Sequence, residues 1–369
     1  MIQTDVAIVG GGLAGLHAAR LLQRAAVDFV VIEARDRLGG RILTLDQAGR
    51  PSDDGFDLGP SWYWPQVQPA IGELVADLGL RSYCQNSDGD VVFERMSREG
   101  RHRYRGQAQE QQSMRLLGGT GALVTALARD LPDDRILLGT RVTAMRLTGH
   151  GAELTIARAD GTTEKRSAAH VIAALPPRLL DATVTFTPPQ DRETAQRWRD
   201  TATWMAPHAK FFALYDRPFW RNAGLSGTAQ SMVGPMVEMH DATTASGGAA
   251  LFGFLGVTAD QRALLGEEKI AQACLEQFAR IFGDAARAPI ATIFKDWAAD
   301  PLTATPADRA AAGHITPSDT PWVSGPWSQR LTMAGSETSP SEAGYLAGAV
   351  IAARRAVEAL LAGSGSPRG

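Results

Sequence analysis

The chain has 369 residues, enough for two domains with large cores, and its 44% hydrophobic and 21% charged residues are ordinary for a globular protein. The net charge of −3, and the lack of any apolar run of about 18 to 20 residues, give no reason to expect a nucleic acid or a membrane as partner. The two cysteines, Cys84 and Cys274, lie far apart in the chain, which excludes a disulfide framework or a zinc site and favours a reducing cytoplasm.

The first predicted element is a buried strand that runs into a glycine-rich turn and a helix. The apolar residues Val6 to Val9 precede Gly10, Gly12 and Gly15, and the helix is expected to begin near Leu13. In a dinucleotide-binding unit the first glycine permits the tight turn, the second lets backbone approach the pyrophosphate, and the third lets helix and strand pack closely. The N-terminal N–H groups of the helix then point at the phosphates.

A second apolar strand, 29–32, ends at Glu33, whose carboxylate can accept hydrogen bonds from a ribose hydroxyl. Glu33 follows Gly15 at close to the spacing typical of dinucleotide-binding folds. A lone glycine motif is weak, but strand, turn, helix, strand and acid in this order favour dinucleotide binding over a purely structural turn.

The residues after Glu33 indicate which dinucleotide is bound. Glu33 to Arg41 reads E-A-R-D-R-L-G-G-R and resembles, without a mismatch, the E-A-x-x-R-x-G-G-R motif of the flavin-containing amine oxidase family. In that family the Gly-Gly-Arg stretch lies along the pyrophosphate and the flavin, so the resemblance implies FAD. Some relatives attach FAD through a cysteine that this chain lacks, and we therefore expect noncovalent FAD.

Further motifs of the family occur in the family's order, so that the resemblance covers most of the chain. They are D-L-G-P-S-W at 57–62, a strand at 170–176 ending in Pro176, K-x-x-x-x-Y-x-x-P-F-W at 210–220, W-A-A-D-P at 297–301, A-G-S-E-T at 334–338 and G-Y-L-A-G-A at 344–349. Several motifs in order are far more specific than any one of them.

The resemblance implies an α/β fold with a discontinuous, Rossmann-like FAD-binding domain and an α+β substrate-binding domain. We expect the FAD-binding domain to comprise residues 1–62, 104–186 and 292–361, the substrate domain residues 63–103 and 187–291, and residues 362–369 to form a flexible tail. A helix is predicted in the substrate domain from about Glu267 to Phe282.

The residues expected to bind FAD are those that match these motifs. They are Gly10, Gly12, Leu13, Ala14, Gly15, Glu33, Ala34, Arg35, Gly39, Gly40, Arg41, Gly59, Pro60, Ser61, Trp62, Val142, Pro176, Gly335, Glu337, Tyr345 and Leu346.

Lys210 is the sharpest candidate for a catalytic residue. It lies in a mostly apolar strand, and lysine is rarely buried without a purpose because desolvating an ammonium is unfavourable. The matching lysine of the family contacts flavin N5 through a water. Burial would lower the pKa of Lys210, so that it could assist oxygen reduction or imine hydrolysis. The alternative is an edge-strand lysine whose head lies in solvent.

Tyr345 and Trp297 complete the expected catalytic set. The matching tyrosine of the family guides a neutral amine past an aromatic wall, whereas the alternative for Tyr345 is a core tyrosine. Glu337 would hold ribityl hydroxyls unless it is a solvated loop acid. Many relatives have a second tyrosine where this chain has Ala307, so the aromatic wall is two-sided here only if another tryptophan fills that place. Candidates for the wall, for each of which core packing is the commoner role, are Trp62, Trp64, Trp204, Phe252, Trp297, Trp322 and Trp327.

The resemblance implies oxidation of a small-molecule amine, by hydride transfer to flavin N5, hydrolysis of the imine to a carbonyl compound, and reoxidation by O2 with release of H2O2. An apolar or aromatic monoamine suits the aromatic-rich composition. The alternatives are a desaturase or an amino acid oxidase on the same scaffold, or a flavoprotein whose FAD is structural. No metal site is expected, because the seven histidines have no ligand-like spacing, and a homodimer is compatible with the sequence.

Overall fold

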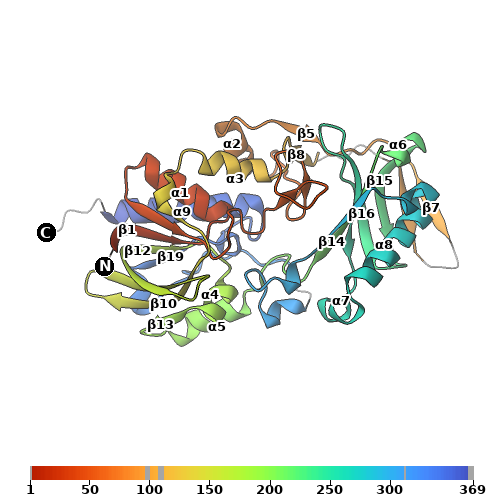
Figure 1. The fold of residues 1–369 in the computed structure, drawn as a ribbon. Helices are drawn as coiled ribbons and strands as arrows, with labels where there is room; N and C mark the ends of the chain where they lie inside the picture. The colour runs from red at the N-terminus through yellow and green to blue at the C-terminus, as the bar shows by residue number, and fades with distance from the viewer. Residues whose placement is uncertain (1, 96–99, 107–111, 311–312, 365–369) are drawn as a thin grey trace.

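The structure is a computed structural model that describes residues 2–95, 100–106, 112–310 and 313–364. Two large sheets lie side by side and give the molecule an elongated shape (Figure 1). Helices cover both faces of the first sheet, and α8 (Glu267–Phe282) lies against one face of the second. The other face of the second sheet packs on residues 56–62, which come from the first part of the chain.

The first sheet is built around β1 (Ile2–Val9), which pairs in parallel with β2 (Phe29–Ile32) and with β12 (Thr163–Ala173). The parallel part continues with β9 (Ile136–Leu137) beside β2 and β19 (Leu331–Met333) beside β12. An antiparallel extension adds β11 (Gly151–Arg158) and β10 (Thr140–Thr148), and β13 (Thr185–Thr187) pairs with β10. The central strands are apolar because both faces of the parallel part are covered.

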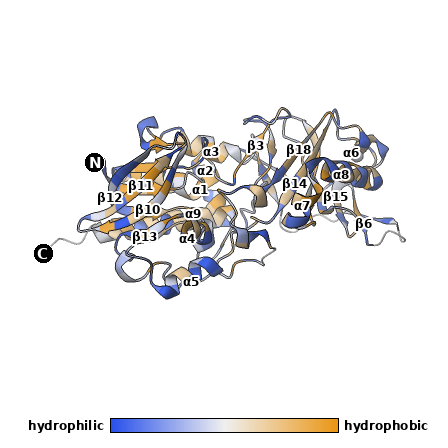
Figure 2. Cartoon of the chain, turned by 60° about the horizontal axis from the view of Figure 1, so that its bottom comes forward, coloured by the Kyte–Doolittle hydropathy of each residue, from blue (hydrophilic) through white to orange (hydrophobic). Residues whose placement is uncertain are grey.

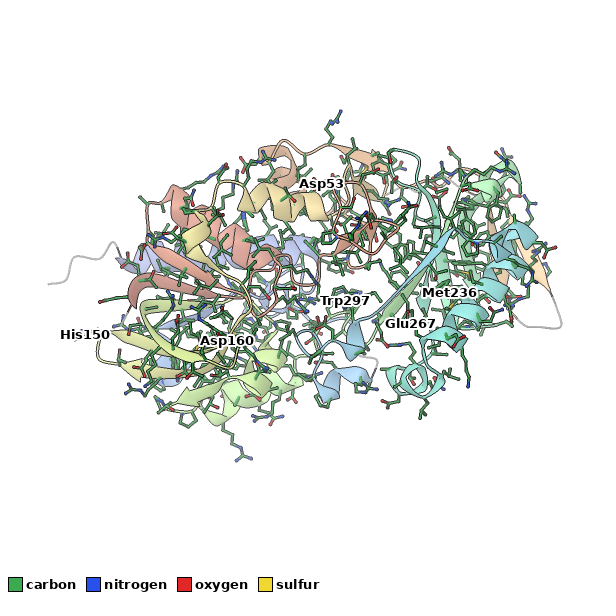
Figure 3. The ribbon with its side chains drawn as sticks, in the orientation of Figure 1. Asp53, His150, Asp160, Met236, Glu267 and Trp297 are labelled. Atoms are coloured by element: carbon green, nitrogen blue, oxygen red, sulfur yellow. The ribbon has the colours of Figure 1, made fainter. Side chains whose placement is uncertain are left out.

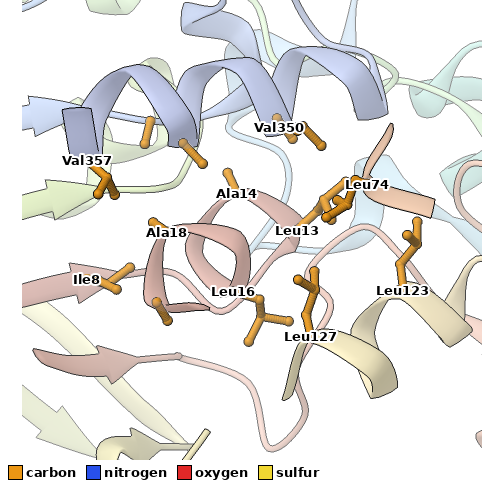
Figure 4. Close-up of a cluster of buried hydrophobic side chains, with 14 of the residues drawn as sticks. Ile8, Leu13, Ala14, Leu16, Ala18, Leu74, Leu123, Leu127, Val350 and Val357 are labelled. Carbon is orange, nitrogen blue, oxygen red and sulfur yellow. The ribbon is translucent and has the colours of Figure 1, made fainter. Parts of the chain in front are cut away.

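One face of this sheet is covered by α1 (Leu13–Arg24), α2 (Pro69–Asp77), α3 (Gly121–Ala128) and α9 (Leu346–Ser364), and the other by α4 (Pro177–Thr183) and α5 (Arg192–Asp200) (Figure 1). The first and last helices lie side by side: Leu13 and Ala14 of α1 share one buried cluster with Val350 of α9 (Figure 4). This packing brings the glycine-rich turn at the start of α1 next to the start of α9.

The second sheet has the order β18 (Ala291–Asp296), β14 (Ala209–Tyr215), β17 (Ala249–Leu255), β16 (Met236–Asp241), β15 (Leu225–Ser231), β6 (Asp90–Glu94) and β7 (Arg101–Tyr104). The predicted helix at Glu267–Phe282 is confirmed as α8, which buries Ile270, Cys274 and Phe278 at helical spacing against the sheet. The short helix α6 (Phe219–Asn222) contacts β15, and α7 (Ala259–Leu265) contacts α8. Two further pairs of short strands are β3 (Thr44–Leu45) with β4 (Phe56–Asp57) and β5 (Ser82–Cys84) with β8 (Met114–Leu116). Apolar residues gather along the strands and inner helix faces, and hydrophilic ones on outer helices such as α5 (Figure 2).

The chain passes between the two sheets several times, which confirms the expected α/β fold with a discontinuous Rossmann-like part. The packing differs from the expected segments at three places. The helices α2 and α5 belong with the first sheet, since their apolar residues join its clusters, whereas β18 pairs with β14 in the second. The last helix continues to Ser364, three residues past its expected end, and the remainder of the expected tail, 365–369, lies outside the described residues. Among the described helices none is both long and apolar enough to cross a membrane.

The buried histidines predict that the fold loses stability in weak acid. Burial, and next the positive charge of Arg354, lower the pKa of His17 in α1 to about 4, and burial lowers the pKa of His170 in β12 to about 4. An unfolded histidine titrates near pH ~6.5, so between pH about 6.5 and 4 the unfolded chain binds more protons. The free energy of unfolding should therefore be highest above pH ~6.5 and should decrease as the pH drops. His17 alone should account for a decrease of about 3 kcal/mol by pH 4.

Thermal unfolding measured from pH 4 to 7 checks this expectation. Neither ring nitrogen of the buried His17 has a hydrogen-bond partner within the described structure, so His17→Leu should raise the melting temperature and flatten its pH dependence. The matched control is His150→Gln, at the exposed turn between β10 and β11 (Figure 3). An unchanged slope in His17→Leu would count against the assignment.

Candidate active site

A cavity lies between the two sheets, and Trp297 is one of the residues that line it (Figure 3). One end is lined by the glycine-rich turn, the Gly-Gly-Arg loop and the segment before α9. The other end is lined mainly by aromatic residues and Lys210. Of the predicted site residues, the cavity brings together Gly10, Gly12, Leu13, Ala14, Glu33, Arg35, Gly39, Gly40, Arg41, Gly59, Pro60, Ser61, Trp62, Pro176, Lys210, Trp297, Gly335, Tyr345 and Leu346.

The glycine-rich turn leaves backbone exposed to the cavity. A Cβ atom added at Gly12 would meet nothing closer than the Gly39 carbonyl oxygen at 3.9 Å, so it would project into the cavity itself. A Cβ atom at Gly15 would lie 1.9 Å from the Gly10 carbonyl oxygen, because α1 packs tightly on the turn. Gly12 therefore leaves space in the cavity, whereas Gly15 allows α1 to pack on the turn.

Glu33 and Arg35, which follow β2, form hydrogen bonds with different segments around the cavity. The Glu33 carboxylate accepts a hydrogen bond from the Gly11 N–H at 2.6 Å and one from the Arg35 N–H at 2.8 Å. Carboxylate oxygens have further lone pairs, so a ribose hydroxyl can still be bound there. The Arg35 guanidinium donates to both oxygens of Asp300, at 3.1 and 2.9 Å, and to Thr303 Oγ1 at 2.9 Å.

An ion pair between a partly exposed arginine and a buried acid joins the Gly-Gly-Arg loop to the segment before α9. Arg41 Nη1 lies 2.7 Å from Oε1 of Glu337, whose side chain is fully buried. The same two side chains bind the backbone of Trp204, since Arg41 donates to its carbonyl oxygen at 2.9 Å and Glu337 accepts from its N–H at 3.3 Å. The solvated-acid alternative for Glu337 is thereby excluded. Because the Arg41 side chain is 28% exposed, breaking this pair should cost less than the ~3 to 5 kcal/mol typical of a fully buried pair.

These features fit the expected FAD. At the end with the glycine-rich turn, the described lining carries two cationic side chains, Arg35 and Arg41, and one acid, Glu33. The first turn of α1 adds unpaired N–H groups and the positive end of the helix dipole beside Gly12. An anionic diphosphate is therefore favoured at this end. The two cysteines lie elsewhere, in β5 and α8, so neither is placed to attach a flavin.

Four predicted cofactor residues do not line the cavity. Gly15 is taken up by helix packing, and Glu337 lies behind the lining in its pair with Arg41. Ala34 is absent from the lining, whereas its neighbours Glu33 and Arg35 reach it. Val142 of β10 is 4% exposed and packs in the core of the antiparallel extension, so its side chain serves the fold.

Lys210 projects from β14 onto residues 57–61. The strand lies between β18 and β17, and the side chain is 5% exposed, which rules out the edge-strand alternative. Lys210 Nζ donates to the carbonyl oxygens of Gly59 at 2.6 Å and Asp57 at 3.2 Å, and to Ser61 Oγ at 2.9 Å. Burial lowers the pKa of Lys210 to about 7, partly offset by the nearby Asp57. The side chain can thus change its protonation state near neutral pH.

Tryptophans form much of the other end of the cavity, and their indole N–H groups are bound away from it. Trp297 donates to the Leu58 carbonyl oxygen at 3.0 Å, Trp62 to Gln85 Oε1 at 2.8 Å and Trp64 to Ser113 Oγ at 2.9 Å. The rings therefore present apolar surface to the cavity. Of the other wall candidates Trp204 lines the cavity, whereas Phe252, Trp322 and Trp327 pack in cores.

Tyr345 precedes α9 and has aromatic neighbours where the sequence lacks a second tyrosine. Its ring centroid is 6.3 Å from that of Trp204 and 5.3 Å from that of His314, which itself stacks on Trp204 at 3.7 Å. The Tyr345 hydroxyl lies 3.2 Å from His314 Nε2. Ala307, at the expected position, lies in a 3₁₀ turn, Pro306–Arg309. Trp204 and His314 thus form the aromatic surface beside Tyr345.

Several lining residues belong to no motif in the sequence and were not predicted, among them Gln68, Met205, His208 and Phe254. Burial lowers the pKa of His208, so this residue is neutral near pH 7. Met205 and His208 belong to the loop before β14. Their closeness to Lys210 in the sequence is the only feature that could have pointed to them. Phe254 lies directly opposite Lys210 in the register of β14 with β17, a pairing that the sequence does not reveal. Within the described residues no group of His, Cys, Asp or Glu is arranged to hold a metal ion.

Comparison with known proteins agrees with the family that the motifs of the sequence resemble. Residues 94–361, well over half of the chain, match the family model described as flavin containing amine oxidoreductase, and residues 8–78 match an NAD(P)-binding Rossmann-like domain. A Mycobacterium tuberculosis protein named as a flavin-containing monoamine oxidase is 26% identical and covers 95% of each chain. An L-amino acid dehydrogenase of Synechocystis is 27% identical over 97% of this chain and 94% of its own. The fold resembles that of a putrescine oxidase bound to putrescine, with a TM-score of 0.80, 23% identity, and coverage of 98% of this chain and 99% of the other.

The cavity geometry predicts that Gly12→Ala folds but loses FAD. The backbone of Gly12 has φ −76° and ψ −175°, which alanine adopts freely, and the added methyl group would occupy only cavity space. We expect an unchanged melting temperature for the apoprotein and FAD affinity lowered by at least about 100-fold, or ~2.7 kcal/mol. Fluorescence titration with FAD measures the affinity.

Gly15→Ala is the matched control. Its methyl group would overlap the Gly10 carbonyl oxygen, so the apoprotein itself should melt at a lower temperature. Wild-type FAD affinity in Gly12→Ala would show that the diphosphate does not lie against this turn.

Proposed function

Because the chain belongs to the flavin-containing amine oxidoreductase family and is an FAD-dependent enzyme, we propose that it oxidises an apolar or aromatic monoamine to an imine, which hydrolyses to a carbonyl compound. The observation that carries the proposal is the aromatic end of the cavity, where Lys210 is the only charged residue in the described lining. Bound FAD supplies the redox chemistry, accepting a hydride equivalent from the amine's α-carbon at N5 and passing two electrons to dioxygen, which leaves as hydrogen peroxide.

The polar end of the cavity would hold the FAD without a covalent bond. Gly12 and the first N–H groups of α1 would bind the diphosphate, and Glu33 would accept from a ribose hydroxyl. Arg41, fixed by Glu337, would lie along the diphosphate and the flavin. The start of α9, at Leu346, would present N–H groups and the positive end of a helix dipole to the ring.

The aromatic end would orient the amine and favour its neutral form. Tyr345, Trp204 and Trp297 offer ring faces to an apolar substituent. No acid among the described residues lines this end, and an ammonium without a counter-ion is disfavoured in such surroundings. The amine would therefore keep the lone pair that its oxidation requires. The same rings keep bulk water from the reacting carbon.

Lys210 would hold and return a proton. Lys210 lines the cavity, and its amine changes protonation state near neutral pH. Reduction of dioxygen to hydrogen peroxide consumes protons, and hydrolysis of the imine requires a group that positions water. Lys210 would serve either step from the same place.

A diamine is less well suited to this cavity. Putrescine carries a second ammonium group, which a binding site would have to neutralise. Glu342 is the acid whose charge acts on Tyr345, but its Oε2 accepts a hydrogen bond from Gln68 at 2.9 Å and it does not line the cavity.

Amino acid oxidation is the second candidate, because an L-amino acid dehydrogenase is among the relatives. A substrate carboxylate would need an arginine that is free to bind it. Both arginines of the described lining are paired, Arg35 with Asp300 at 2.9 Å and Arg41 with Glu337 at 2.7 Å. This favours the amine. A purely structural FAD is disfavoured because Lys210 and Tyr345 both line the cavity.

Anaerobic mixing of the FAD-loaded enzyme with candidate substrates tests the proposal. We expect an arylalkylamine to bleach the flavin absorption band rapidly. A diamine or an L-amino acid of similar size should bleach it much more slowly. Faster bleaching by the amino acid would favour the second candidate. Failure of every amine, amino acid and alkene tested would contradict an oxidative role.

Lys210→Met should retain FAD but be reoxidised by O2 about 100-fold more slowly, the usual effect of removing a proton-transfer group. Stopped-flow mixing of the reduced variant with aerated buffer measures this rate. Lys269→Met is the control, because this lysine is exposed on α8. Reoxidation of Lys210→Met at the wild-type rate would remove the proposed role.

A further inference from the structure

The chain is poor in lysine, which makes Lys210 unusual. It has 37 basic residues but only four lysines, Lys165, Lys210, Lys269 and Lys295. Lys165 pairs with Glu153, Lys295 pairs with Asp300, and Lys269 is exposed. Lys210 is the one that lines the cavity and the one whose side chain is buried without a direct ion pair in the described structure. Because no carboxylate contacts Nζ in the described structure, other groups must decide whether Lys210 is charged.

The immediate surroundings of Lys210 suit an ammonium. Nζ has three acceptors, two carbonyl oxygens and one hydroxyl, and a protonated lysine has three hydrogens to donate whereas a neutral one has two. The rings of Phe252 and Phe254 also face Nζ, with centroids 4.7 and 5.0 Å away. Aromatic faces attract a cation. Burial of the side chain opposes the charge.

Asp57 lies directly behind these contacts. Its own carbonyl oxygen accepts from Lys210, while its carboxylate points into the protein and is 1% exposed. Asp57 Oδ1 accepts from Thr44 Oγ1 at 2.6 Å and from the Thr120 N–H at 2.8 Å, and Oδ2 is buried with no partner in the described structure. Burial raises the pKa of Asp57, whereas Arg115 and these donors act in the opposite direction. These hydrogen bonds favour the ionised form of the carboxyl, while its burial, the larger effect, holds the pKa above its ordinary value.

Arg115 supplies the opposing charge. It lies in β8, is 4% exposed, and donates to the carbonyl oxygens of Thr243 at 2.9 Å and Ala242 at 3.4 Å. Its Nε is buried and has no partner within the described residues. After burial, which lowers the pKa of Lys210 to about 7, the Asp57 charge raises that pKa and the Arg115 charge lowers it. Neither residue lines the cavity.

We propose that Asp57 and Arg115 are positioning residues that act through Lys210: the two buried charges together decide whether Lys210 faces the flavin as an ammonium or as an amine. This inference rests on the proposed role of Lys210. Other charged groups near β14 are accounted for. Lys295 lies opposite Lys210 on β18 but directs its ammonium to Asp300 and the face of Trp297, and β17 presents the uncharged Phe254. His208, on the preceding loop, is held neutral by burial.

The four lysines make a direct test practicable. With lysine carbon-13 labelled at Cε, the FAD-loaded protein should give four resolvable signals whose shifts report protonation of Nζ, and the Lys210 signal is the one absent from Lys210→Met. We expect a wild-type midpoint near pH 7 for Lys210. In Asp57→Asn the midpoint should fall by about 1 pH unit, and in Arg115→Gln it should rise by about 1 pH unit, since each removes one charge near the lysine. The other three midpoints should stay in place.

Arg115→Lys is the matched control, because it keeps the charge and should leave the Lys210 midpoint unchanged (its new signal is distinguished by comparison with wild type). Opposite shifts in the two charge-removing variants support the proposal, since a loss of packing would not invert its sign. An unmoved midpoint in Asp57→Asn, or shifts of the same sign in both, overturns it. If one of the two does not fold, the other alone still predicts a direction.

The pH profile of flavin reoxidation provides a second measurement. Its midpoint should move with that of Lys210 in each variant. The nuclear magnetic resonance titration needs no turnover, so it remains decisive even if no amine is oxidised. Failure of the proposed function and failure of this inference are therefore distinguished.

Discussion

The contact between Lys210 and residues 57–61 is the interaction on which the site depends. The lysine comes from the second sheet, and its acceptors come from a segment that the first part of the chain places over the cavity. Desolvating an ammonium is costly, so the contact is stable only if its acceptors are held in place. It thereby joins the two halves of the molecule where the reactive part of the flavin and the amine are proposed to meet.

The cavity is divided chemically along its length, and the division accounts for its proposed use. Glycine backbone, helix N-termini and paired arginines line one end, where they favour an anionic, extended dinucleotide. Tryptophan and tyrosine faces line the other, where they favour an apolar and uncharged group. The ion pair of Arg41 and Glu337 fixes the boundary, because it also binds the backbone of Trp204. FAD binding and amine binding thus share one set of supports.

Much of this arrangement could be predicted from the sequence where a local rule applies. The glycine-rich turn and the bounds of α8 follow from spacing, and the burial of Lys210 follows from the apolar strand that contains it. Tertiary contacts could not be predicted. The places of Trp204 and His314 beside Tyr345, the core role of Val142, and the charges of Asp57 and Arg115 behind Lys210 all depend on segments far apart in the chain. Whether α2 and β18 belong with the first or the second sheet depends on packing and strand pairing, which the hydrophobic periodicity of the sequence does not reveal.

A crystal structure of the FAD-loaded protein tests the central claim most directly. The account predicts one FAD per chain, extended through the cavity, with the diphosphate against Gly12 and the first turn of α1 and the flavin ring between Lys210 and the start of α9. The ring should have the aromatic end of the cavity open beside its N5. Density for FAD in another orientation, or a cavity filled by protein side chains in crystals of protein that carries FAD, would contradict it.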